Sequence, residues 1–167
     1  TLAAEEAMAG LVSKHLEGCK HVADLFAGSG TFALRLAQKA RVYAAEGDAI
    51  ALATLDIAAR QWPSLKPVTA EKRDLFHRPL LTKELAQFDG LVFDPPRAGA
   101  EFQCRQIARS EVKRVAAVSC NPGTLARDLA ILVDGGYRVT QVVPIDQFLW
   151  SPHVEAVALL EKKTKRR

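Results

Sequence analysis

The sequence has few of the features that mark secreted, metal-binding and membrane proteins. Its three cysteines, Cys19, Cys104 and Cys120, lie far apart and form no C-x-x-C pair. This spacing argues against a disulfide framework and against a cysteine-rich zinc or iron–sulfur site. No apolar run approaches the roughly 20 residues of a membrane helix, and no signal-peptide pattern opens the chain. We therefore expect a cytoplasmic chain that binds no metal ion, no iron–sulfur cluster and no membrane.

Length and composition indicate one globular domain. The chain has 167 residues, of which 49% are hydrophobic and 25% are charged. This is the ordinary balance of a folded domain, and we find no internal repeat and no low-complexity linker. The chain begins at Thr1 and has one methionine, Met8, so we expect it to start inside a longer protein.

The net charge of +4 suggests nucleic-acid binding, but the positive charge is concentrated at one end of the chain. Residues 162–167 hold five basic groups, and without them 18 basic residues remain against 19 acidic ones. We expect one folded domain over residues 1–161 and a disordered basic tail over residues 162–167. The alternative for the tail is a phosphate-binding arm.

Two alternating periodicities predict an α/β fold. Apolar residues at spacings of three and four predict helices over residues 2–17, 31–39, 48–60, 80–87, 101–110 and 122–133. Short apolar runs predict strands over residues 21–26, 41–45, 67–70, 88–93, 113–119, 137–143 and 154–160. Seven nearly continuous apolar strands with intervening helices indicate a mostly parallel sheet with helices on both faces.

The first candidate binding element is the glycine turn in residues 24–31, which leads from a predicted strand into a predicted helix. Small residues allow a ligand to approach the backbone, and the helix N-terminus offers free N–H groups. Glu46 ends the next strand, where a carboxylate can accept both hydroxyls of a ribose, and Asp74 follows the third strand. Together these residues predict a site for a nucleoside-type cofactor. The alternatives are a tight turn and ordinary exposed acids, and for Asp74 its neighbours Lys72 and Arg73 favour simple loop polarity.

A second element is the stretch Asp94-Pro95-Pro96-Arg97, which follows another predicted strand. Two prolines stiffen the backbone and provide no N–H group, so they fix the direction of the acidic side chain. Such stiffness suits the positioning of a substrate, because displacements of about 1 Å can cost large factors in rate. The alternative is a simple strand terminator.

Cys120 is the candidate nucleophile. It ends an apolar strand and precedes Asn121, a good helix N-cap, and Pro122, which suits the first helical position. The dipole of that helix favours the thiolate form of a neighbouring cysteine. The alternative is a buried structural cysteine, which is how we interpret the other two cysteines.

Glu155 is the candidate general base, because it interrupts a strand that otherwise consists of core residues. Burial of an unpaired carboxylate is costly and favours its protonated form, which makes such a group a candidate for proton transfer. His153 lies two residues earlier, on the same side of the predicted strand. The alternative is a core glutamate held by a salt bridge.

These elements, in this order and spacing, resemble the RNA uracil-C5 methyltransferase family. The similar segments are DLFAGSGTF, VYAAE, DPPRAG, SCNPGTLARD and HVEAVALL, and together they cover roughly residues 24–160. Members of this family form 5-methyluridine in transfer RNA or large-subunit ribosomal RNA and use S-adenosylmethionine as methyl donor. The resemblance implies a Rossmann-like class I methyltransferase fold, S-adenosylmethionine as cofactor, an RNA partner, and a chain that we expect to act as a monomer.

The resemblance also implies roles for individual residues. The catalytic residues are Cys120 as nucleophile, Glu155 as the base that removes the C5 proton, and Asp94 near the target base. The substrate or RNA contacts are Arg97, Asn121 and His153. The residues of the cofactor site are Asp24, Phe26, Gly28, Gly30, Thr31, Glu46, Asp74 and Asp94, with Glu46 on the ribose and Asp74 on the adenine.

Two alternatives to this function remain open from the sequence. One is an amino-methyltransferase of the same fold that acts on exocyclic nitrogens of bases; such enzymes prefer an aromatic residue where this chain has Arg97, and they do not need Cys120. The other is a cofactor-binding fragment that is inactive without RNA-binding segments, which the family carries before this domain. Residues 148–153, Phe-Leu-Trp-Ser-Pro-His, also depart from the Phe-Pro-x-Thr pattern that the family often has before its His-x-Glu element.

Overall fold

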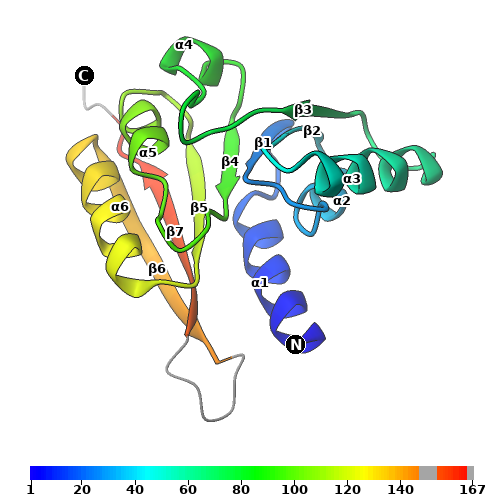
Figure 1. Ribbon diagram of the computed structural model, residues 1–167. Coiled ribbons are helices and arrows are strands. Elements are labelled where there is room, and N and C mark those ends of the chain that lie inside the picture. Colours follow the sequence, from blue (N-terminus) through cyan, green and yellow to red (C-terminus); the bar gives the residue numbers. More distant parts are fainter. Residues whose placement is uncertain (147–153, 165–167) are drawn as a thin grey trace.

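A computed structural model describes residues 1–146 and 154–164 (Figure 1). The strands are β1 (His21–Leu25), β2 (Arg41–Glu46), β3 (Val68–Lys72), β4 (Gly90–Phe93), β5 (Arg114–Ser119), β6 (Tyr137–Ile145) and β7 (Glu155–Lys162). The helices are α1 (Leu2–His15), α2 (Ala33–Leu36), α3 (Ala49–Gln61), α4 (Thr82–Leu85), α5 (Glu101–Ala108) and α6 (Pro122–Asp134). None of these helices is long and apolar enough to cross a membrane.

The strands form a seven-stranded sheet in the order β3-β2-β1-β4-β5-β7-β6. The neighbours from β3 to β5 pair in parallel, whereas β7 pairs antiparallel with both β5 and β6. The predicted α/β class with a seven-stranded, mostly parallel sheet is therefore confirmed. Because β7 runs against its neighbours, it begins at the edge of the sheet where the parallel strands end.

Helices cover both faces of the sheet, and each face has its own core (Figure 1). Side chains alternate across a strand, so in β4 Leu91 and Phe93 belong to one core and Val92 belongs to the other. The first core includes residues of α4, α5 and α6, and the second includes residues of α1, α2 and α3. Burial on both faces explains why the strands consist of nearly continuous apolar residues.

The sheet order changes direction next to β1. The chain passes from β1 outward to β2 and β3, and then returns to the other side of β1 for β4 and β5. In open α/β sheets, the crevice beyond the carboxyl ends of the strands at such a switch point is where ligands bind. The loops after β1 and β4 are therefore the parts of the fold in which to look for a site.

The predicted helix boundaries lie within two residues of the observed ones except at the end of α2; at α4, a helix was predicted over residues 80–87 and the structure has one over Thr82–Leu85. A helix was predicted over residues 31–39, but α2 spans only Ala33–Leu36. The residues after it form tighter turns, in which the N–H of Gln38 donates to the carbonyl of Arg35 and the N–H of Lys39 donates to that of Leu36. The cap predicted at Asn121 is confirmed, because its side chain caps α6, and the Asp48 side chain caps α3 in the same way.

The fully buried Tyr137 at the start of β6 provides a test of the packing. Its hydroxyl donates a 2.7 Å hydrogen bond to the backbone carbonyl of Val112. Tyr137→Phe leaves that carbonyl without this donor, so we expect a loss of about 1–2 kcal/mol in unfolding free energy, measured by urea denaturation. Val142→Ala, on the exposed face of the same strand, is the control and is expected to change stability by less than about 0.5 kcal/mol. Equal stability of Tyr137→Phe and the parent chain would contradict this description of the core.

Candidate active site

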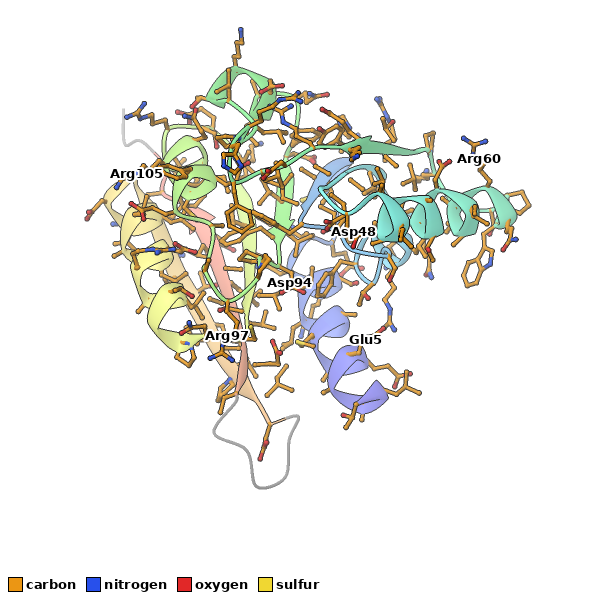
Figure 2. All side chains as sticks on the ribbon, in the orientation of Figure 1. Glu5, Asp48, Arg60, Asp94, Arg97 and Arg105 are labelled. Atoms are coloured by element: carbon orange, nitrogen blue, oxygen red, sulfur yellow. The ribbon has the colours of Figure 1, made fainter. Side chains whose placement is uncertain are left out.

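The loops at the carboxyl edge are tied together by backbone hydrogen bonds that continue beyond the strand ends. The N–H of Asp94, after β4, donates to the carbonyl of Leu25 in β1 at 3.2 Å. The N–H of Ala27, after β1, donates to the carbonyl of Ala45 in β2 at 3.0 Å. The loops that carry the predicted cofactor residues are thus joined at the switch point of the sheet. In Figure 2, Asp94 lies near the middle of the molecule, between α1 and the half of the sheet that carries α5 and α6.

These loops enclose a cleft of about 390 Å³, a volume within the usual range for small-molecule sites. Of the residues predicted to bind a cofactor, the cleft is lined by Phe26, Gly28, Glu46, Asp74 and Asp94. It is also lined by residues that the sequence interpretation did not select, namely Gly47, Arg73, Leu75, Phe76, Pro95 and Pro96. The structure therefore brings together acids from three separate strand ends in one cleft.

The Glu46 carboxylate is held in place by backbone donors. Its Oε2 accepts the N–H of Gly28 at 2.8 Å, and its Oε1 accepts the N–H of Asp48 at 2.8 Å. The turn that supplies the first donor has left-handed backbone at Phe26, with φ +60°, and at Gly28, with φ +55°. Each oxygen keeps a further lone pair, so the carboxylate is oriented and still able to accept hydroxyl groups of a ligand.

Asp24 lies at the end of β1 and is fully buried. Within the described part of the chain, neither of its carboxylate oxygens has a hydrogen-bond partner. Burial raises the pKa of Asp24 well above its usual range, and the negative charge of Asp94 raises it further, while the nearby backbone N–H of Ala33 offsets part of the rise. A buried carboxyl without a partner is costly, and a cationic group placed next to it relieves that cost. Asp24 does not line the cleft.

Asp74 and Phe76 form one wall of the cleft, but the Asp74 carboxylate is engaged within its own loop. It accepts the N–H of Phe76 at 3.0 Å and lies 2.7 Å from Nδ1 of His77. The His77 contact lowers the pKa of Asp74 below its usual value. The Phe76 ring lies 5.4 Å from the ring of Phe26, so the two aromatic side chains meet at the cleft.

Arg73 anchors the loop that carries Asp74, a role that the sequence interpretation missed. The Arg73 side chain is 8% exposed and makes two hydrogen bonds to the Glu84 carboxylate, at 2.9 and 3.0 Å. It also donates to the carbonyls of Arg78 at 2.7 Å and of Pro79 at 2.9 Å. The guanidinium therefore joins both ends of the 73–84 segment. No local pattern separates Arg73 from the exposed Lys72 beside it, so its burial became visible only in the structure.

The strand register brings Cys120 and Glu155 together. Ser119, the last residue of β5, pairs with Ala156 of β7, so positions 120 and 155 are adjacent at the carboxyl edge. Val118 and Val157, one residue further into the sheet, belong to the same core face. Cys120 and Glu155 are both partly exposed, so both can be reached from solvent.

Asp94 belongs to the same cluster. Burial, together with the charge of Glu155, raises the pKa of Asp94 to about 7. Burial also raises the pKa of Glu155. Asp94 lines the cleft, and Glu155 is adjacent to Cys120 in the strand register. A group that changes protonation near neutral pH, next to a cleft and a thiol, is typical of a catalytic site.

The other predicted residues occupy different places. Asn121 caps α6 and donates from Nδ2 to the carbonyl of Arg97 at 3.1 Å, while the Arg97 side chain is exposed (Figure 2). Gly30 and Thr31 line a different, larger groove of about 940 Å³ between α1 and α2. His153 lies outside the described residues. Among the residues that the structure describes, no group of three or more His, Cys, Asp or Glu side chains is arranged to hold a metal ion.

Solved structures confirm the fold class. The magnesium protoporphyrin IX methyltransferase of Synechocystis, at 15% identity, superposes with a TM-score of 0.71 over 97% of this chain and 82% of its own. The tRNA (uracil-54, C5)-methyltransferase of Pyrococcus abyssi, solved with S-adenosyl-L-homocysteine, superposes with a TM-score of 0.78 at 28% identity. That match covers 93% of this chain and 38% of the archaeal chain. The fold is the Rossmann-like fold of methyltransferases.

The chain belongs to the tRNA (uracil-5-)-methyltransferase family, whose sequence profile matches residues 7–163. A protein of Mesorhizobium japonicum described as an uncharacterized RNA methyltransferase is 69% identical over all of this chain. A 23S rRNA (uracil(1939)-C(5))-methyltransferase of Chromohalobacter salexigens is 41% identical over 89% of it. The chain spans about 40% of the length of the first relative and 31% of the second.

The raised pKa of Asp94 gives a pH-dependent prediction. The folded chain holds the Asp94 proton more tightly than the unfolded chain, so the stabilisation from this proton is complete below about pH 4 and is lost as the pH rises to about 7. Asp94→Asn lacks this dependence. We expect the unfolding free energy of the variant, relative to the parent chain, to increase by about 2 kcal/mol between pH 5 and pH 8 in ligand-free urea denaturation.

Glu17→Gln is the matched control for this pH series. Lys39 lowers the pKa of Glu17, so the stability that this ion pair contributes is lost only in acid, below the range examined. The difference between this variant and the parent chain is expected to be the same at pH 5 and at pH 8. If the stability difference between Asp94→Asn and the parent chain is also the same at pH 5 and at pH 8, the Asp94 carboxyl is not buried as the structure describes.

Proposed function

We propose that this chain is the catalytic part of an S-adenosylmethionine-dependent RNA methyltransferase that methylates C5 of a uridine through a covalent bond to Cys120. The observation that carries the proposal is the position of Glu155 beside Cys120, where β7 runs antiparallel to β5. A nucleophile and a base are thus adjacent, and Asp94 links them to the cofactor cleft. Uracil C5 methylation needs both groups, because one activates the ring and the other removes a proton from it.

The cleft residues fit S-adenosylmethionine. Glu46, oriented by the turn at Gly28, would accept the ribose hydroxyls, and Phe76 would pack against the adenine. Asp24 is a buried carboxyl without a partner among the described residues, so it favours a ligand that brings positive charge to this edge of the sheet. The archaeal relative that was solved with S-adenosyl-L-homocysteine supports the same cofactor class.

The proposed reaction begins at Cys120. The thiolate adds to C6 of the uracil ring, and the electrons of the C5=C6 double bond move toward O4, so that C5 becomes nucleophilic. S-adenosylmethionine, when bound, supplies the methyl group that C5 takes up. The bond from Cys120 to C6 holds the ring in place during this methyl transfer.

Glu155 completes the reaction as a general base. It takes the proton from C5, the C5–H electrons restore the double bond, and the bond between C6 and the cysteine sulfur breaks. Because burial raises the pKa of Glu155, its carboxylate accepts a proton more readily than an exposed glutamate does. Asp94 lines the cleft and would face the reacting region from the cofactor side.

The proposed substrate is a uridine in ribosomal or transfer RNA. The named relatives modify uridines in one or the other of these RNAs. A base within a helix must leave its stack to reach a thiol at the edge of the sheet. The exposed Arg97 next to this edge carries the positive charge expected of an RNA contact.

Replacement of Cys120 tests the nucleophile. In the complete protein, we expect Cys120→Ala to lower the rate of 5-methyluridine formation by about 10³-fold or more and to leave cofactor affinity nearly unchanged. Labelled S-adenosylmethionine, RNA without 5-methyluridine and mass spectrometry of the nucleosides provide the measurement. Cys104→Ala, at a fully buried cysteine in the core, is the control and is expected to keep activity. Normal turnover by Cys120→Ala, or methyl groups found on base nitrogens, would contradict the proposal.

Replacement of Glu155 tests the base. Glu155→Gln keeps the size of the side chain but removes the proton acceptor, so we expect methyl transfer to occur and the cysteine–RNA bond to persist. The adduct is detected as a slow-migrating band on a denaturing gel. The control is Glu161→Gln, at a half-exposed position of the same strand, which is expected to turn over normally without an adduct. Release of product by Glu155→Gln at the parental rate would exclude Glu155 as the base.

A further inference from the structure

The first two turns of α6 hold the loop that follows Asp94. Positions 121, 124 and 128 of this helix are spaced by three and four residues, so their side chains lie on one face. That face contacts the backbone of residues 97–100, which form the second half of the loop between β4 and α5. Cys120 immediately precedes this helix.

Two side chains of α6 donate to one carbonyl of the loop. The carbonyl oxygen of Arg97 accepts Nδ2 of Asn121 at 3.1 Å and the hydroxyl of Thr124 at 3.0 Å. The Thr124 hydroxyl also lies 3.3 Å from the carbonyl of Asn121, so the loop carbonyl is the nearer of its two acceptors. The backbone at Arg97 is therefore fixed from two directions.

The next helical turn holds the following residues of the loop. Arg127 donates to the carbonyl of Ala98 at 2.9 Å and to the Asp128 carboxylate at 2.9 Å. Asp128 is 1% exposed, and its second oxygen accepts the N–H of Ala100 at 2.7 Å. Such charge-assisted hydrogen bonds in a buried place are strong and directional.

Gly99 shows how closely the loop approaches the helix. It has left-handed backbone, with φ +76°, and a Cβ atom at this position would lie 2.5 Å from Nη2 of Arg127 and 2.8 Å from Oδ2 of Asp128. Only glycine accommodates both the conformation and the contact. Loop and helix are thus packed as one unit, because α6 holds the backbone at positions 97, 98 and 100 by hydrogen bonds and lies against position 99.

We propose that Thr124, Arg127 and Asp128 are positioning residues. They hold the loop that lines the methyl-donor cleft at a fixed distance from the nucleophilic thiol. We call these three side chains and their hydrogen bonds to residues 97–100 the clamp. Pro95 and Pro96 line the cofactor cleft on the loop that the clamp holds, and Cys120 lies just before the helix that carries the clamp. The clamp sets the distance between the methyl group and the uracil ring that Cys120 holds. Misplacement by about 1 Å can cost about 100-fold in rate. This inference rests on the proposed function.

Thr124 provides the sharpest test, because two small substitutions distinguish the effect of its hydroxyl hydrogen bond from the effect of its side-chain shape. Thr124→Val has the same shape but no donor for the Arg97 carbonyl, whereas Thr124→Ser keeps the donor. In the complete protein we expect Thr124→Val to lower kcat about tenfold or more, with the KM for RNA unchanged and alkylation of Cys120 by iodoacetamide at the parental rate. Thr124→Ser is expected to retain most of the parental kcat. Equal kcat values for the two variants would overturn the proposal.

Hydrogen exchange tests the clamp without reference to activity. Asp128→Asn loses the charge that pairs with Arg127, so we expect faster exchange of the Ala100 amide than in the parent protein, while the β5 amides remain protected. Unchanged exchange at Ala100 would also overturn the proposal. If exchange and the thiol reactivity behave as expected but the parent protein forms no 5-methyluridine, the proposed function fails and the clamp remains as a structural unit.

Discussion

The candidate site depends on the antiparallel course of β7 between β5 and β6. A parallel strand at this place would begin at the opposite edge of the sheet, and its first residue would lie far from Cys120. Because β7 runs the other way, Glu155 at its start is next to the residue that follows β5. The backbone hydrogen bonds that pair Ser119 with Ala156 therefore fix the relative position of the thiol and the carboxylate. Two groups that are 35 positions apart in the chain, at 120 and 155, are thus held by the pairing of β5 with β7.

Crowding of negative charge is the second constraint at this edge. Asp24, Asp94 and Glu155 come from three different strands, and burial raises the pKa of each of them. The cost of bringing these carboxyls together is offset if a cationic ligand occupies the cleft, and S-adenosylmethionine carries such charge. Arg73 does not neutralise this cluster, because its guanidinium is committed to Glu84 and to loop carbonyls. Under the proposed function, a positively charged cofactor in the cleft would offset part of this cost.

Much of the fold was predictable from the sequence, because buried strands leave continuous apolar runs and long helices leave capping residues such as Asp48 and Asn121. Helix α2 was predicted too long, since the tight turns after it use residues that suit a helix equally well. Strand-end motifs also indicated Glu46, Asp94, Cys120 and Glu155. Arg73 and Asp128 were not predicted, because their roles arise from burial in the tertiary structure, which the chemistry of a single residue does not reveal. For Asp128 one signal was available, namely its spacing to Asn121 and Thr124 on one face of the helix. The residues assigned to RNA contact stay predictions, with His153 outside the described residues.

The central claim is that Cys120 forms a covalent bond with a uridine at this edge of the sheet. The most direct measurement uses RNA in which 5-fluorouridine replaces uridine, because Glu155 cannot remove fluorine as it would remove the C5 proton, and the adduct persists. The complete protein is incubated with this RNA and S-adenosylmethionine, digested, and mapped by mass spectrometry. We expect a methylated fluorouridine nucleotide attached to the peptide that contains Cys120. Absence of an adduct from an otherwise active protein, or attachment at Cys19 or Cys104, would contradict the account.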